Sequence, residues 1–114
     1  MKEFTLIFRL SDTADTRPSS GQIQERLRWL ANIAAQNKLV DKGNTLSVTS
    51  AKTVRNETMV TDGPFTEIKE FINGYLIVRA ENIDEAVALA RTSPIFKVGG
   101  SIEVREILTL YDVR

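Results

Sequence analysis

The sequence contains neither cysteine nor histidine. Without cysteine, the chain has no disulfide framework and no thiolate chemistry. Without histidine, a general base working near neutral pH would have to be an Asp, Glu, Lys or Tyr side chain with a shifted pKa. A transition-metal site would have only carboxylates as charged ligands, which disfavours zinc. We therefore expect neither a bound metal nor a cofactor, and the sequence designates no catalytic residue.

A strong charge of one sign and a long apolar run are also missing. The 15 basic and 15 acidic residues give a net charge of zero, which argues against a nucleic-acid partner. No apolar run approaches the roughly 18 residues of a membrane span, and the first three residues lead into a strand pattern without a signal peptide. We expect a cytoplasmic protein with no membrane partner. Its 114 residues predict one domain, residues 1–114.

Strands are predicted where apolar side chains alternate or β-branched residues cluster. Residues 3–10 alternate with period two, so Phe4, Leu6, Phe8 and Leu10 share one face of a strand. Tyr75–Val78 is apolar on both faces and must be covered on both sides. The further predicted strands are 45–54, 59–61 after a turn at 55–58, 71–80, and 101–110 after a turn at Gly99–Gly100.

The first of two predicted helices opens near Ser20, because Ser19 and Gln22 have the spacing of a capping box. We expect it to end near Lys38, before a turn at Asp41–Asn44. Trp29 is predicted to pack at the margin between helix and sheet, and the alternative is a Trp that stacks on a ligand. The expected buried stripe consists of Ile23, Leu27, Leu30 and Ala34.

The second predicted helix is capped by Asn82 with Glu85 and is closed by Pro94. The element order is then β-α-β-(β)-β-α-β, which predicts an α+β, ferredoxin-like split βαβ fold. An antiparallel sheet would carry both helices on one face. A second subunit is the natural cover for the other face, so we expect a homodimer. The side chains expected on that open face are Thr5, Ile7, Arg9, Tyr75, Ile77, Arg79, Glu103, Arg105 and Ile107.

The turn Asp62-Gly63-Pro64-Phe65 has the most site-like pattern of the chain. Gly63 can adopt backbone angles closed to other residues, and Pro64 fixes its own φ, so both are expected to be structural turn residues. Asp62 is a candidate binding or acid–base residue, or it caps its own turn. Phe65 is a candidate ligand contact or a plug of the core. Glu67 and Lys69 are expected to form a surface ion pair.

Three arginines, Arg9, Arg79 and Arg105, are expected on the open face of the sheet together with Tyr75. They either pair with Glu103 and with acids of a partner subunit, or they form a cavity that receives an anionic small molecule. The candidate ligand-binding residues are therefore Asp62, Phe65, Arg9, Tyr75, Arg79 and Arg105.

The segments Thr53-Val54-Arg55, Val60 to Glu70, Gly74-Tyr75-Leu76-Ile77 and Gly99 to Arg105 resemble the YCII-related proteins of the DGPF-motif branch. The resemblance is specific from about Thr53 to Ile107. It implies a dimeric α+β barrel, in which two ferredoxin-like subunits pack their open sheet faces together. Members of the wider family are mostly uncharacterised bacterial proteins.

The resemblance does not supply an acid–base pair. The short YCII proteins carry a histidine and an aspartate on the first helix, whereas this chain has no histidine and no carboxylate at residues 34–36. The family's Gly-Gly is here Asn73-Gly74, which predicts a bend or bulge.

Two classes of function stay open at this point. One is a small-molecule binding protein or enzyme with a cavity between sheet and helices and Asp62 at its mouth. The other is a non-enzymatic dimeric interaction or regulatory module.

Overall fold

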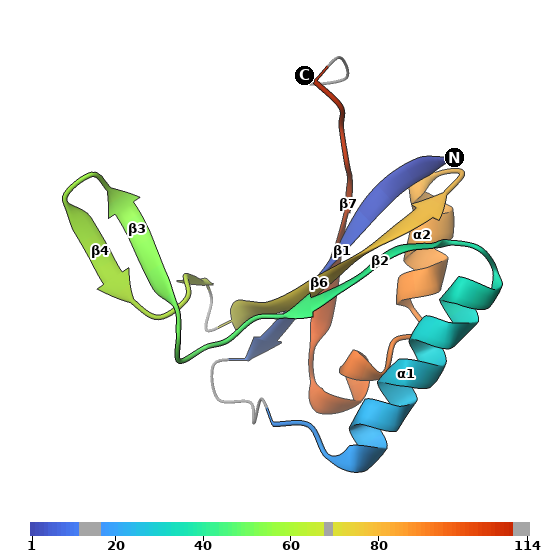
Figure 1. The fold of residues 1–114 in the computed structure, drawn as a ribbon, viewed down its shortest axis with the longest axis horizontal. Coiled ribbons are helices and arrows are strands. Elements are labelled where there is room, and N and C mark those ends of the chain that lie inside the picture. The colour runs from blue at the N-terminus through green and yellow to red at the C-terminus, as the bar shows by residue number, and fades with distance from the viewer. Residues whose placement is uncertain (12–16, 68–69, 111–114) are drawn as a thin grey trace.

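The computed structural model describes residues 1–11, 17–67 and 70–110 (Figure 1). Residues 12–16 of the predicted loop and Lys69 of the predicted Glu67–Lys69 pair lie outside this set. In chain order the elements are β1 (Lys2–Ser11), α1 (Ser20–Ala35), β2 (Leu39–Thr45), β3 (Lys52–Asn56), β4 (Met59–Asp62), β5 (Thr66–Glu67), β6 (Glu70–Ala80), α2 (Ile83–Ala90), the 3-10 helix η1 (Pro94–Val98) and β7 (Ser101–Glu106).

The main sheet is antiparallel and has the strand order β2-β6-β1-β7, with the short β5 pairing to β6. The two central strands, β1 and β6, are far apart in the sequence. Both helices lie on one face of this sheet (Figure 1). This arrangement is the ferredoxin-like α+β fold, and the predicted fold class is confirmed.

The core lies between the sheet and the two helices. Period-two alternation in β1 buries one side of the strand and leaves the other side half-buried, as predicted. β6 alternates in the same way from Gly74 to Ala80, after an interruption at Ile72 and Asn73. The buried cluster consists of Phe4, Leu6, Phe8, Trp29, Ile33, Leu76, Val78, Ala80, Ala86, Leu89 and Ala90.

The capping residues of both helices were predicted correctly. The Ser19 hydroxyl accepts a hydrogen bond from the Gln22 backbone N–H at 3.2 Å, and the Gln22 side chain accepts one from the Ser19 N–H at 2.8 Å. The Asn82 side chain accepts one from the Glu85 backbone N–H at 2.9 Å. Each side chain satisfies an N–H group that the first helical turn leaves unpaired, which is why these residues begin the helices.

The predicted buried stripe of α1 is wrong except at Leu30, which is partly buried and packs against the core. Ile23 and Leu27 are 46% and 59% exposed, whereas Trp29 and Ile33 are buried. Trp29 therefore lies in the core and not at its margin. Its indole N–H donates to the Leu89 carbonyl at 3.2 Å and to the Thr92 hydroxyl at 3.0 Å, and these bonds fix the helix in this rotation.

The predicted turn at Asp41–Asn44 and the predicted strand at 45–54 are also wrong, because β2 spans Leu39–Thr45 and the next strand begins at Lys52. Turn chemistry is present inside β2: the Asp41 carboxylate accepts the Gly43 N–H at 2.7 Å, and Gly43 has a φ of 66°. The chain forms a bulge in a continuing strand, because β6 lies alongside and pairs with residues on both sides of it.

A second bulge lies at the end of the sheet where β1 pairs with β6. Phe8 pairs with Gly74 and Arg9 pairs with Ile72, so Asn73 is the extra residue. The predicted bend at Asn73-Gly74 is therefore confirmed. The last strand, in contrast, ends at Glu106 and is shorter than predicted.

The β3–β4 hairpin forms a separate two-stranded sheet. It projects away from the helices, on the left of the view in Figure 1. The hairpin and its turn were predicted from the sequence, whereas its separation from the main sheet was not.

Candidate functional site

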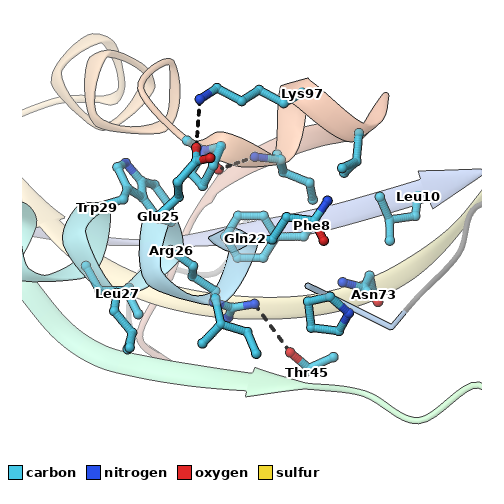
Figure 2. A pocket seen from close by; sticks show the side chains of 17 residues that line it. Phe8, Leu10, Gln22, Glu25, Arg26, Leu27, Trp29, Thr45, Asn73 and Lys97 are labelled. Carbon is cyan, nitrogen blue, oxygen red and sulfur yellow. Dashed lines mark hydrogen bonds and ion pairs between the residues drawn. The ribbon is translucent and has the colours of Figure 1, made fainter. Parts of the chain in front are cut away.

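A cavity of about 440 Å³ lies between the sheet, the N-terminal half of α1 and η1 (Figure 2). Its floor is formed by Phe8 and Leu10, which β1 presents on its helix-facing side. The ring of Trp29 meets Phe8 edge to face, with ring centroids 6.0 Å apart, and forms one wall. Leu30 and Ile95 are among the other apolar residues that line it. The size falls within the range of about 300–1,000 Å³ of small-molecule sites.

A few polar groups line this cavity. They come from α1, from the end of β2, from the bulge of β6, and from η1 with its N-cap residue, and they are Gln22, Glu25, Arg26, Thr45, Asn73, Ser93 and Lys97. The bulge explains why Asn73 is among them, because an extra residue changes the direction in which a strand presents its side chains. Thr45 pairs with Gly74 across the edge of the same sheet.

Arg26 reaches over the apolar floor. Its guanidinium carbon lies 5.6 Å from the centroid of the Phe8 ring, and its Nη1 donates to the Thr45 hydroxyl at 3.3 Å. Figure 2 shows the side chain extending from α1 to Thr45. Burial lowers the pKa of Arg26 below its usual value, although an arginine side chain stays charged at neutral pH.

An ion pair lies at the edge of the cavity. Lys97 of η1 donates to Glu25 of α1 at 2.7 Å, and the Lys97 side chain is 71% exposed (Figure 2). This pair connects the two helical elements that border the cavity. Because it is exposed, we expect it to contribute little to stability.

Asp62 and Phe65 do not line the cavity, so the expectation that Asp62 lies at its mouth is wrong. The Asp62 carboxylate is 92% exposed and accepts from Lys52 Nζ at 2.6 Å across the hairpin. Phe65 is 57% exposed, with the Arg55 guanidinium 5.8 Å from its ring centroid. Gly63 has a φ of 85°, which agrees with its predicted role in the turn.

Arg9 and Arg105 share one carboxylate on the open face of the sheet. Arg9 donates to Glu103 at 2.9 Å and Arg105 donates to the same side chain at 3.4 Å. The hydrogen bond from Arg9 is the largest cause that lowers the pKa of Glu103. Of the two alternatives that the sequence left open for these arginines, the structure therefore shows the ion pair with Glu103.

Arg79 and Tyr75 lie on the same face but on β6, on the other side of β1. Arg79 is opposite Glu3 in the strand register, and its Nε is buried without a hydrogen-bond partner. The Tyr75 hydroxyl accepts a hydrogen bond from the Asn44 amide at 3.2 Å. The six candidate residues thus occupy two regions, the hairpin and the open face, and neither region borders the cavity.

The family model for the YCII-related domain matches residues 6–110. The chain belongs to the YCII-related family. An uncharacterized protein of Rhizobium meliloti (strain 1021) is 39% identical over 88 residues, which cover 68% of this chain and 70% of that protein.

Membrane-spanning helices and metal-binding clusters are absent from the described parts of this YCII-related chain. No helix among residues 1–11, 17–67 and 70–110 is long and apolar enough to cross a membrane. In the same residues, no three acidic side chains come close enough together to hold a metal ion.

Sequence reasoning missed Arg26, the central polar residue of the cavity. Arg26, Trp29 and Ile33 follow the spacing i, i+3 and i+7, so they share one face of α1. Because the first of these positions is an arginine, the face was not recognised as a buried one. The series that starts at Ile23 is entirely apolar and was predicted to be buried instead. The signal that could have identified this face was the pair Trp29 and Ile33.

Proposed function

We propose that this YCII-related protein binds a small molecule in the cavity beneath α1 and that it acts as a homodimer in the cytoplasm. The sequence Asp62–Phe65 favours the DGPF-motif branch of the family. The zero net charge argues against a nucleic-acid partner.

The observation that carries the binding proposal is the cavity itself. It combines an apolar floor, formed by Phe8 and Leu10, with a small number of polar groups around it. Small-molecule sites have this composition, because apolar surface supplies affinity and a few polar groups fix orientation. A hydrophobic core without a binding role would be expected to fill such a space with side chains.

Binding can be tested with 1-anilinonaphthalene-8-sulfonate, a dye with an aromatic body and one sulfonate charge, whose emission increases in an apolar site. We expect the dye to quench Trp29, which lines the cavity and is the only Trp of the chain. Thr45→Phe should fill part of the cavity and weaken dye binding. Val40→Phe is the matched control, because Val40 lies exposed on the same strand and does not line the cavity. Equal dye binding by the two variants would contradict the proposal.

The dimer proposal is supported by the open face of the sheet. Thr5, Ile7, Tyr75 and Ile77 are only half-buried in the single chain, and both helices pack on the opposite face. A two-sided apolar strand needs a cover on each side. A second copy that packs face to face would supply it, with Arg9, Glu103 and Arg105 as charged neighbours.

Self-association can be tested by light scattering and native mass spectrometry at micromolar concentration. We expect a dimer whose interface buries more than roughly 1,000 Å². Ile7→Glu should dissociate it, because a buried unpaired charge is costly. Ile83→Glu is the control, since Ile83 is exposed on α2. A wild-type monomer would overturn the dimer proposal, and native spectra would also reveal a retained ligand.

An interaction or regulatory role is the second candidate. It is favoured by the ion pairs that Arg9 and Arg105 make with Glu103, because paired arginines on the open face do not need an anionic ligand there. A dimer without any ligand effect on Trp29 emission would support this role over the first.

A further inference from the structure

Arg26 places a positive charge on the buried face of α1, where helix packing calls for an apolar side chain. Its guanidinium contacts two neutral groups, the Phe8 ring and the Thr45 hydroxyl. Among the described residues, no carboxylate pairs with it. The neighbouring carboxylate of Glu25 is instead engaged by Lys97 at 2.7 Å.

A half-buried guanidinium without a counter-charge loses hydration that its neutral contacts replace only in part. The aromatic face of Phe8 attracts a cation, and the Thr45 hydroxyl accepts one hydrogen bond. Arginine has five N–H donors in a planar fork, so further donors can reach a ligand. The lowered pKa of Arg26, caused by burial, agrees with this incomplete compensation.

We infer that the cavity binds a small monocarboxylate whose apolar body packs on Phe8, Leu10 and Trp29 while its carboxylate pairs with Arg26. This inference rests on the proposed binding function and adds the chemical class of the ligand. The planar guanidinium fork matches the two oxygens of a carboxylate. The side-chain amides of Gln22 and Asn73 line the same cavity and offer additional donors (Figure 2).

The charge balance of the cavity favours a single negative charge on the ligand. Among the described residues, Arg26 and Lys97 are the two cationic side chains that line it, and Glu25 already neutralises Lys97. A phosphate monoester carries a charge of about −1.5 to −2 at neutral pH and would be under-compensated by one arginine. The mostly apolar lining favours an aliphatic or aromatic body over a sugar.

The test compares acids with their neutral amides. Octanoate and phenylbutanoate, each beside its amide, are titrated against the full chain while the emission of Trp29 is followed. We expect each acid to bind about 10- to 100-fold more tightly than its amide, since hydrogen bonds to charged groups are stronger than those between neutral groups. This comparison uses the unmodified protein and does not depend on the stability of any variant.

Arg26→Met keeps most of the side-chain length and removes the charge. It should weaken binding of the acids by the same factor and leave the amides almost unchanged. Arg28→Met is the matched control: Arg28 is exposed on the same helix and does not line the cavity, so this variant should retain the preference for acids.

The outcomes separate the two proposals. If acid and amide bind the wild-type chain equally, or if Arg26→Met retains the preference, the inference about carboxylates is wrong while binding in the cavity stands. Loss of the preference in Arg28→Met as well would assign it to general surface charge and would also refute the inference. If neither acids nor amides change Trp29 emission, and the dye result is negative too, the proposed binding function itself fails.

Discussion

Gly43 should be the glycine of this chain that tolerates a side chain least. It is buried in the bulge of β2, with a φ of 66°. A Cβ built on its backbone lies 1.6 Å from the carbonyl oxygen of Tyr75 on the neighbouring strand. Contacts of a real Cβ below 3.0 Å essentially never occur, so Gly43→Ala requires β2 and β6 to separate by more than 1 Å.

Two costs add in Gly43→Ala. The left-handed backbone costs an alanine about 1 kcal/mol. Separating β2 from β6 weakens several ladder hydrogen bonds, each worth about 1 kcal/mol net, and loosens the buried packing beneath them. We therefore expect a loss of about 4 kcal/mol or more in the free energy of unfolding. This is a large part of the roughly 5–15 kcal/mol of a typical domain.

Gly63→Ala is the matched comparison. Gly63 has a φ of 85°, and a Cβ on it would meet nothing within 4 Å. This variant has the backbone strain without the clash, so we expect a loss of only about 1 kcal/mol.

Urea unfolding followed by Trp29 emission and a thermal melt would measure both losses. At about 4 °C per kcal/mol, Tm should fall by about 4 °C in Gly63→Ala and by about 15 °C or more in Gly43→Ala. Equal losses in the two variants would refute the close approach of Gly43 to β6. An unchanged Tm in Gly63→Ala would refute the strained geometry of its turn.

Three further predictions concern the helices. Ile33→Ala should lower the free energy of unfolding by about 3 kcal/mol because Ile33 is fully buried, whereas Leu27→Ala should lower it by less than about 1 kcal/mol. If urea unfolding shows the larger loss for Leu27→Ala, α1 has the rotation that the series from Ile23 predicted. Trp29→Phe should cost about 2 kcal/mol or more, since it leaves a void and removes an N–H that donates to two oxygens, and a neutral effect would contradict burial of the indole. The pKa of Glu85 is lowered first by its hydrogen bond from Lys38, so this carboxylate stabilises the fold above its unfolded pKa of about 4.3 and loses that effect as pH falls through the lower folded pKa. Glu85→Gln should therefore be less stable than wild type at pH 7, and the difference should shrink as the pH falls below the unfolded pKa; a pH-independent difference would refute the pairing.

The sequence by itself predicted the elements whose signals are local. β1 alternates with period two over its length, and β6 does so from Gly74 to Ala80, so this alternation predicts which side chains are buried there. Ser19 and Asn82 bind N–H groups only three residues away, so the helix starts do not depend on tertiary contacts. The order of these elements then restricted the fold to the ferredoxin-like arrangement.

The open face of the sheet was predicted for the same reason. Arg9, Glu103 and Arg105 alternate with core residues along two neighbouring strands, so the sequence placed them on one side. It could not decide between a shared ion pair and an anion site, because that choice depends on the distances between strands.

Only the tertiary structure decided the rotation of α1, the bulge at Gly43 and the position of the cavity. Two series of residues on α1 compete for burial, and the one that starts at Arg26 contains a charge. The bonds from Trp29 to Leu89 and Thr92, 60 and 63 residues away, select this series. The Asp41–Gly43 contact forms a turn in isolation and a bulge when β6 lies beside it. The cavity brings together β1, α1, the β6 bulge and η1, and no local pattern records that these segments meet. Local hydrogen bonds and hydrophobic periodicity involve residues that are only a few positions apart, so the sequence reveals them. The site depends on contacts between segments that are distant in the chain.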